Sequence, residues 1–272
     1  MKSSSIKTLV VGVDFSEYSS LVVRQAKQLA AQMNLPLVYV FVYEEIDLTH
    51  KSIPLDRNEV TQIYEVKVRS HYELDPQQKV LVRFGRAEKE LLKVASKEKN
   101  PLILVGHQSG HSIARFFLGS VAENLAVTTT FPLWIHRGDQ VVRPRKILIP
   151  SDLSTRSDKT IQQVRGLKKA FEFEIEIYHV LNQPLPILDY KVWAAVEKAL
   201  QEADQKKIEN FKKKHPSLKL IKSRGGIAES IEEHSKKFDL IALSPRTKTK
   251  ASFGRVTGKI VRSGSRPVLV LP

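Results

Sequence analysis

The segment Leu102–Ser120 carries residues whose types and spacing suit the binding of a phosphate. It reads LILVG, a short buried strand, followed by a loop that opens at Gly106 and closes at Gly119 and Ser120. The next residues, VAENLAV, fit a helix, so the loop ends at a helix N-terminus. Backbone N–H groups at such a turn bind anions, and glycine permits a close approach or a positive φ. The segment therefore predicts a phosphate-binding loop.

Catalytic interpretations of this loop are weaker. The letters GHQSG fit a nucleophile elbow, but that motif needs an acid and then a histidine downstream of Ser109, whereas Asp139 follows His136. No Gly-Lys-Ser or Gly-Lys-Thr occurs, which excludes a Walker loop. His107 and His111 have the spacing of a metal pair only on a helix, so exposed loop histidines are favoured. The sequence thus favours binding over catalysis.

The elements around the loop alternate between strand and helix. Continuous apolar runs such as LVYVFV are typical of strands buried in a parallel sheet. Strands are expected at 7–13, 37–42, 79–84, 102–105 and 131–136, and helices at 16–33, 59–71 and 87–97 and after the loop. This order implies right-handed crossovers and a doubly wound α/β sheet. Ligands of such sheets bind beyond the carboxyl ends of the strands, where Asp14, Val42 and Gly106 would converge if the first and fourth strands are neighbours.

The pattern begins again after residue 139. RKILIPSDLS repeats KTLVVGVDFS, so Asp152 corresponds to Asp14. Gly226 is expected to correspond to Gly85 before a helix, and the last two strands repeat at 239–243 and 267–271. A repeat of this length is a duplicated domain. The chain is therefore predicted to hold two five-stranded parallel-sheet domains in tandem, residues 1–139 and 140–272.

The second copy lacks the residues that suit the first loop to a phosphate. Ser244 and Pro245 stand where the first copy has Gly106, and proline has no N–H to offer an anion. The glycine before the next helix, Gly254, is followed by Arg255 instead of serine. We expect a degenerate site there and a structural, dimer-like or regulatory role for the second domain.

The loop spacing also resembles that of a known family. Gly106, Ser109, Gly119 and Ser120 form Gly-x2-Ser-x9-Gly-Ser, which resembles the adenine-nucleotide loop Gly-x2-Gly-x9-Gly-Ser/Thr of the universal stress protein family. Ser109 replaces the second glycine, and Gly110 follows one position later. A first strand that ends in aspartate, a Gly-Arg-Ala-Glu turn and a proline before the last strand also resemble the family.

The resemblance covers both halves of the chain and has structural implications. It implies Rossmann-like domains of the adenine nucleotide alpha hydrolase type. It also implies that the two domains pair about a pseudo-two-fold axis through their last strands, which contain FPLWIH and PVLVLP. Trp134 would then lie at the domain interface, although an ordinary core position explains a tryptophan equally well.

The resemblance further implies an ATP site in the first domain, with Mg²⁺ as an optional bridge between phosphates. Asp14 would accept hydrogen bonds from the ribose or adenine, or it could instead cap the next helix. Adenine would meet the backbone at the end of the second strand, and any hydrolysis would be slow and incidental. The residues assigned to the site are Asp14, Val40, Phe41, Val42, Gly106, His107, Ser109, Gly110, Arg115, Gly119, Ser120 and Val121.

The formal net charge of +15 is unevenly distributed, with +2 in residues 1–140 and +13 in residues 141–272. The densest basic run, Lys206–Arg224, lacks interleaved exposed aromatics and any nucleic-acid motif, so nucleic-acid binding is disfavoured. Charge runs are most often solvated faces, but this one could contact a protein partner. The alternative to ATP binding is therefore an interaction scaffold that uses the basic second domain. Association of two chains into a homodimer also stays open.

The composition and the apolar runs of the sequence indicate the cellular compartment in which the protein is expected. The 272 residues contain no cysteine, which excludes disulfides and thiolate metal sites and fits a reducing environment. The first residues have too short an apolar run, and an acid too early, for a signal peptide. No apolar run approaches the length that spans a membrane. We expect a cytoplasmic protein without membrane contact.

Overall fold

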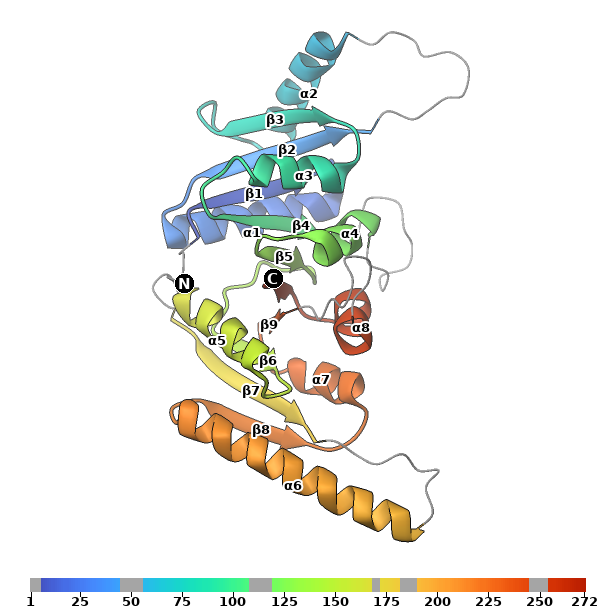
Figure 1. Cartoon of the computed structure of the whole chain (residues 1–272). Coiled ribbons are helices and arrows are strands. Elements are labelled where there is room, and N and C mark those ends of the chain that lie inside the picture. Colours follow the sequence, from blue (N-terminus) through green and yellow to red (C-terminus); the bar gives the residue numbers. More distant parts are fainter. Residues whose placement is uncertain (1–5, 45–55, 108–118, 168–171, 182–189, 245–253) are drawn as a thin grey trace, which may run out of the picture.

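The computed structural model describes residues 6–44, 56–107, 119–167, 172–181, 190–244 and 254–272, apart from the side chains of residues 190–193. These parts form one ten-stranded sheet with helices on both faces (Figure 1). Within those ranges, no helix is both long and apolar enough to cross a membrane. The sheet has two halves of five strands with the same topology, so the predicted tandem α/β fold is confirmed.

The first domain contributes half of the sheet. Its strands are β1 (Thr8–Val13), β2 (Leu37–Tyr43), β3 (Lys79–Phe84), β4 (Pro101–Gly106) and β5 (Leu133–His136), and its helices are α1 (Glu17–Met33), α2 (Arg57–His71), α3 (Ala87–Ala95) and α4 (Ser120–Thr128). The strands are all parallel, in the order β3-β2-β1-β4-β5. β1 and β4 are neighbours, as the predicted convergence of ligand groups requires. The strand order reverses between them, which opens a crevice at their carboxyl ends.

The second domain repeats this topology. Its strands are β6 (Lys146–Pro150), β7 (Glu174–Val180), β8 (Lys219–Ser223), β9 (Leu240–Leu243) and β10 (Val268–Val270), and its helices are α5 (Thr155–Leu167), α6 (Tyr190–Lys214), α7 (Ile227–Ser235) and α8 (Arg255–Ser263). Its strand order, β8-β7-β6-β9-β10, matches that of the first domain strand for strand. The two domains are therefore copies of one unit.

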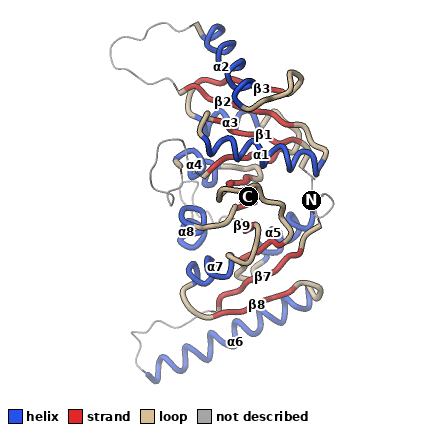
Figure 2. The backbone as a smooth tube through the Cα atoms, turned by 180° about the vertical axis from the view of Figure 1, so that it is seen from behind, coloured by secondary structure: helices blue, strands red, loops and turns tan. Residues whose placement is uncertain are grey.

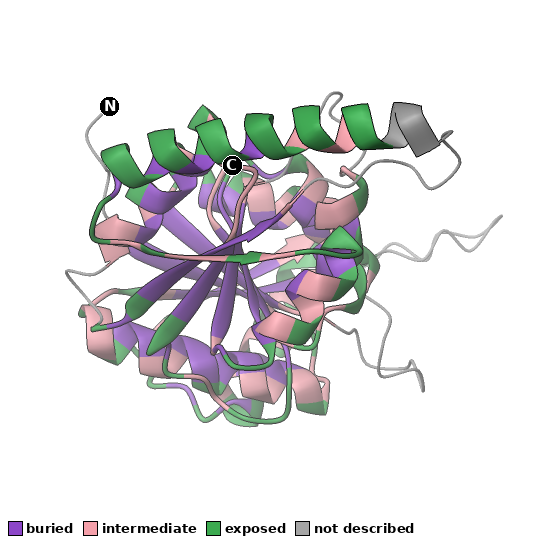
Figure 3. Cartoon of the chain, turned by 90° about the horizontal axis from the view of Figure 1, so that it is seen from below, coloured by how far each residue is buried: buried purple, intermediate pink, exposed green. Residues whose placement is uncertain are grey.

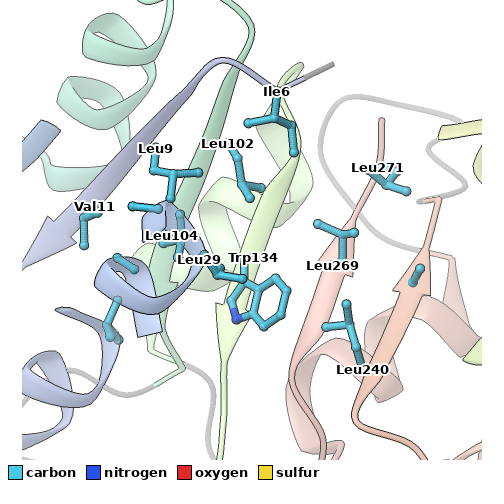
Figure 4. Close-up of a cluster of buried hydrophobic side chains, with 14 of the residues drawn as sticks. Ile6, Leu9, Val11, Leu29, Leu102, Leu104, Trp134, Leu240, Leu269 and Leu271 are labelled. Atoms are coloured by element: carbon cyan, nitrogen blue, oxygen red, sulfur yellow. The ribbon is translucent and has the colours of Figure 1, made fainter. Parts of the chain in front are cut away.

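The domains join through their last strands. β5 and β10 pair antiparallel, with Trp134 opposite Leu269. These two residues are equivalent, because Leu133 and Val268 occupy the same register against β4 and β9 in their own domains. A local two-fold axis thus passes between Trp134 and Leu269, and the predicted pseudo-two-fold pairing is confirmed. Trp134 is 3% exposed and packs in a core that runs across this seam, so it lies both at the interface and in the core (Figure 4).

The helices cover both faces of the sheet (Figure 2). One core layer packs α1, α2, α5 and α6 against the strands, and the other packs α3, α4, α7 and α8. The inner strands are almost wholly buried, as their continuous apolar runs predict, whereas the outer strands β3 and β8 are only partly covered. α6 exposes most of its length (Figure 3). α2 and α6 lie over the outer strands at opposite ends of the sheet (Figure 1).

Local capping sets the helix boundaries. Ser16 caps α1, because its Oγ accepts a hydrogen bond from the Ser19 N–H at 3.0 Å. α2 begins at Arg57, earlier than the apolar pattern predicts, because the side chain of Asp56 caps it by accepting from the Asn58 N–H at 2.8 Å. Helix starts are therefore decided by the capping residue and only approximately by the apolar stripe.

The predicted correspondence between Gly226 and Gly85 is wrong by one residue. Gly85 and Gly225 are the equivalent pair, with φ of +121° and +123°. Gly226 is instead the N-cap of α7, with a φ of −63°. Only glycine adopts a positive φ readily, so the glycine with a positive φ in each turn shows which residues of the two domains are equivalent. Consequently Ile227 of α7 is the counterpart of Ala87 in α3.

Candidate functional site

A cavity of about 360 Å³ opens at the carboxyl ends of β2, β1 and β4. Its position is the crevice expected of a doubly wound sheet. Eight of the residues assigned to the site from sequence line it, namely Asp14, Val40, Phe41, Val42, Gly106, Gly119, Ser120 and Val121. Three others, Ser109, Gly110 and Arg115, lie outside the described residues. The structure thus brings most of the predicted site together.

The floor of the cavity is apolar and depends on a glycine. It is formed by Gly12 and Val40 from two adjacent strands, by Ala87 and Leu91 of α3 and by Val105 of β4. A Cβ added to Gly12 would lie 3.1 Å from Leu91 Cδ1 and 3.3 Å from Val105 Cγ1, which is a tight contact. The sequence analysis missed Gly12, Ala87 and Leu91, although a glycine inside a strand is itself a sign of close approach.

Asp14 caps the strand-to-helix turn and also faces the cavity. Its Oδ1 accepts hydrogen bonds from the backbone N–H of Ser16 at 3.1 Å and from the Ser16 hydroxyl at 2.6 Å. Phe15 between them adopts the left-handed region, with a φ of +62°. The carboxylate is exposed, and none of the described residues donates to its Oδ2. The capping and ligand-binding roles left open by the sequence are therefore compatible.

The N-terminus of α4 opens onto the same cavity. Its N-cap, Gly119, makes no side-chain cap hydrogen bond, and Ser120, Val121 and Ala122 of the first turn line the cavity. The N–H groups of a first turn have no partner inside the helix and attract anions. Gly119 has a φ of −62°, which other residues also adopt, and glycine is a common residue at the N-cap of a helix.

His107 does not line the cavity, although the sequence assigned it to the site. Its ring packs edge-on against Tyr18 of α1, with 4.7 Å between the ring centroids. Its backbone instead closes the loop, because His107 O accepts a hydrogen bond from the Gly119 N–H. Phe41 also turns its ring away, onto Tyr64 at 4.7 Å on the other face of the sheet. Phe41 can therefore meet a ligand in the cavity with its backbone alone.

Both halves of the chain match one family model, that of the universal stress protein family, over residues 5–137 and 144–272. The chain belongs to the universal stress protein family. The tandem arrangement predicted from the sequence is thereby confirmed.

Solved structures resemble this tandem universal stress protein over its whole length. A universal stress protein of Archaeoglobus fulgidus DSM 4304 is 17% identical, with a TM-score of 0.65, and the match covers 100% of this chain and 99% of that one. A functionally unknown protein of Pseudomonas aeruginosa PAO1 is 10% identical, with a TM-score of 0.69, and the match covers 99% and 93%. No curated protein sequence matches the chain. At these identities the structures support the fold alone.

The second domain of this universal stress protein has a smaller cavity at the equivalent place, of about 250 Å³. Val40 pairs with Gly12 in the first domain, and Tyr178 pairs with Pro150 in the second, so Tyr178 stands where Val40 does. Ile227 likewise replaces Ala87. Larger side chains thus occupy the floor of the second cavity, a difference that the loop comparison did not reveal.

His136 lies at the end of β5 in this universal stress protein. It is fully buried, and neither ring nitrogen has a partner among the described residues. Burial, with a smaller effect from the charge of His107, lowers the pKa of His136 to about 4. The imidazole is therefore neutral in the folded protein at neutral pH.

We predict that His136 makes stability depend on pH between about 4 and 6.5. Its pKa is lower in the folded than in the unfolded chain, so the unfolded chain binds more protons in this window and stability falls as pH falls. The loss between pH 7 and pH 5 is expected to be about 2 kcal/mol. Urea unfolding at both pH values would measure it. His136→Phe should remove this contribution, and an unchanged pH dependence in that variant would contradict the prediction.

Proposed function

We propose that this universal stress protein binds one ATP molecule in its first domain, residues 1–139, and none in its second, residues 140–272. One observation carries the proposal: the exposed Asp14 carboxylate and the uncapped N-terminus of α4 face a single cavity of about 360 Å³. That volume lies within the range of small-molecule sites in proteins. The Asp14 carboxylate supplies an acceptor for hydroxyl groups, and the N-terminus of α4 supplies N–H donors for phosphates.

The order of the groups along the sheet fits the order of the parts of a nucleotide. An apolar slot between Val40, Ala87 and Leu91 lies at β2, Asp14 follows at β1, and the N-terminus of α4 lies beyond β4. A base would occupy the slot, ribose hydroxyls would donate to Asp14, and phosphates would reach the N–H groups of α4. Backbone groups at the end of β2 would contact the edge of the base.

Mg²⁺ would be held chiefly by the phosphates. Among the described residues, no group of three or more His, Cys, Asp or Glu is arranged to hold a metal ion. Mg²⁺ commonly takes only one or two carboxylates and completes its shell with phosphate oxygens and water. The exposed Asp14 is a carboxylate of this kind.

The proposed role is regulatory rather than enzymatic. ATP would favour one conformation or one partner during a stress response, in the reducing cytoplasm that a chain without cysteine fits, and any hydrolysis would be slow and incidental. A second candidate is an interaction scaffold that binds no nucleotide. It is favoured by the exposed lysines of α6, namely Lys198, Lys206, Lys207, Lys212, Lys213 and Lys214.

Titration with Mg²⁺ and ATP tests the proposal. The purified chain would first be denatured to identify any released nucleotide, and the nucleotide-free form would then be titrated in a calorimeter. We expect about one ATP per chain. No released nucleotide and no saturable binding would instead favour the scaffold.

Asp14→Ala is expected to weaken ATP binding about 10-fold, because it removes a charged hydrogen-bond acceptor. The matched control is Asp152→Ala in the second domain, whose Oδ1 accepts from the Ser154 N–H at 3.1 Å in the equivalent turn. Each variant loses the hydrogen bond from the N–H two residues further along the chain, so the two variants share this part of the structural cost. Equal affinity in the two variants would contradict a role for Asp14 in binding.

A further inference from the structure

The apolar slot of the first cavity has a carboxylate at its edge. Among the described residues, Asp14 and Glu44 are the charged ones that line this cavity. Asp14 comes directly after β1 and is assigned to the ribose, whereas Glu44 comes directly after β2 and has no assigned role. The sequence analysis did not assign Glu44 to the site. Glu44 is therefore a charged group, so far unexplained, at the end of the cavity where the base is expected.

Glu44 connects two of the elements that form the slot. Its Oε1 accepts a hydrogen bond from the Ala87 N–H, with 3.3 Å between the two heavy atoms. Ala87 is the first residue of α3, whose N-cap, Arg86, makes no side-chain cap hydrogen bond. Glu44 thus supplies an acceptor to this helix start, and the positive end of α3 favours a carboxylate there. Because Val40 of β2 and Ala87 of α3 both line the slot, this contact holds the carboxylate at the edge of the slot.

The second oxygen of this carboxylate is available to a ligand. Within the described part of the chain, the Ala87 N–H alone donates to Glu44, and it does so to Oε1. Glu44 is exposed. The neighbouring cation, Arg86, is instead paired with Glu88, with 2.7 Å between Arg86 Nη2 and Glu88 Oε1. An ionised carboxylate accepts hydrogen bonds and donates none, so the edge of the slot favours a ligand group that donates one.

The walls of the slot and its edge make different demands on a ligand. The side chains of Val40, Ala87 and Leu91 offer no hydrogen bonds, so they suit the apolar face of a flat ring. The edge of the ring that reaches Glu44 needs a hydrogen-bond donor, since a carbonyl there would face the carboxylate with its lone pairs. Adenine, guanine and cytosine carry an exocyclic amine, whereas thymine carries carbonyls. The carboxylate thus provides a means of choosing among bases.

We propose that Glu44 determines the base specificity of the first cavity by accepting a hydrogen bond from the exocyclic amine of the bound base. The inference rests on the proposed function, because it concerns the base of the nucleotide assigned to this cavity. In ATP the donor is the N6 amine of adenine. One hydrogen of this amine meets Glu44 Oε2, and the other stays available to a backbone carbonyl at the end of β2. A base without a donor at this edge would leave the carboxylate unpaired.

Purine riboside triphosphate is the matched probe, because it is ATP with the N6 amine replaced by hydrogen. Calorimetric titration of the full chain with Mg²⁺ and each nucleotide compares the two affinities. We expect ATP to bind about 10-fold more tightly than purine riboside triphosphate. Equal, saturable binding of both nucleotides would overturn the proposal for Glu44. The proposed function would stand in that case, since ATP would still bind.

Glu44→Ala isolates the contact. It should weaken ATP binding about 10-fold and leave purine riboside triphosphate unchanged, so that the preference for ATP is lost. Comparing two nucleotides on one variant cancels the cost of losing the bond to the Ala87 N–H. The matched control is Asp56→Ala, which removes another exposed carboxylate at a helix start, one that accepts from the Asn58 N–H at 2.8 Å outside the cavity. An undiminished preference in Glu44→Ala, or its loss in both variants, would overturn the assignment.

GTP separates a failure of this inference from a failure of the proposed function. Guanine carries a carbonyl where adenine carries its amine, and its own amine lies at another position of the ring. If the wild type bound GTP more tightly than ATP, and Glu44→Ala did not, ATP would be the wrong ligand for the first domain. Glu44 would remain the residue that selects the base. Failure of all three nucleotides to bind saturably would overturn both the inference and the proposed function.

Discussion

Val40→Tyr combined with Ala87→Ile is expected to lower ATP affinity on the order of 100-fold, about 2.7 kcal/mol, while the chain remains folded. The two substitutions place in the first cavity the side chains that Tyr178 and Ile227 place in the second. A filled slot excludes the base, whereas Asp14 and the N-terminus of α4 keep their positions. The second domain shows that this fold accepts the larger residues. Calorimetric titration with Mg²⁺ and ATP would measure the loss.

The matched control for this double variant is Val66→Tyr with Ala203→Ile, the same chemical changes at exposed positions of α2 and α6. It should bind ATP as the wild type does. Circular dichroism and urea unfolding would establish that both variants are folded. If the cavity variant bound ATP normally, the base would not lie between β2 and α3, and the assignment of the slot would be wrong.

Arg137→Met is expected to destabilise the protein by about 3 kcal/mol. Arg137 follows β5 of the first domain, is 3% exposed, and donates hydrogen bonds to the carbonyls of Val261 and Gly264 at the C-terminus of α8. Burial lowers the pKa of Arg137 to about 10, so the guanidinium stays charged at neutral pH. Methionine fills similar space but leaves both carbonyls without their donor. The free energy of unfolding in urea would measure the effect.

Arg262→Met provides the comparison for the interface. Arg262 also bridges the domains, because its Nε lies 2.7 Å from Glu123 Oε1 of α4, but its side chain is 56% exposed. Exposed ion pairs contribute about 0–1 kcal/mol, so this variant should remain close to wild type. Equal losses for the two variants would show that burial of Arg137 does not decide the strength of the interface.

Arg137 connects the candidate site to the second domain. The backbone oxygen of His136 accepts a hydrogen bond from the His107 N–H at 3.2 Å. The next residue, Arg137, donates to the carbonyls at the C-terminus of α8. The end of β4 therefore contacts β5, and the residue after β5 contacts α8 of the second domain. The Tyr18 hydroxyl adds a further bond, donating to His136 O at 3.1 Å.

The sequence by itself determined the elements, the duplication and the residues at the carboxyl ends of the strands. Apolar runs and capping residues are local signals, and the repeat of KTLVVGVDFS as RKILIPSDLS is visible without any structure. Asp14 and Gly119 were placed at the site for the same reason. Each lies at the junction of a predicted strand or loop with a helix, and such junctions meet at one edge of a parallel sheet.

Only the tertiary structure decided which side chains open or fill the two cavities. Val40 and Ala87 are far apart in the sequence, and their meeting depends on the phase of a strand and on the first residue of a helix. A shift of one residue, as between Gly225 and Gly226, sends a side chain in another direction. The reach of Arg137 to α8 likewise follows from the antiparallel seam. Contacts between distant segments depend on side-chain direction and register, which local sequence patterns specify only loosely.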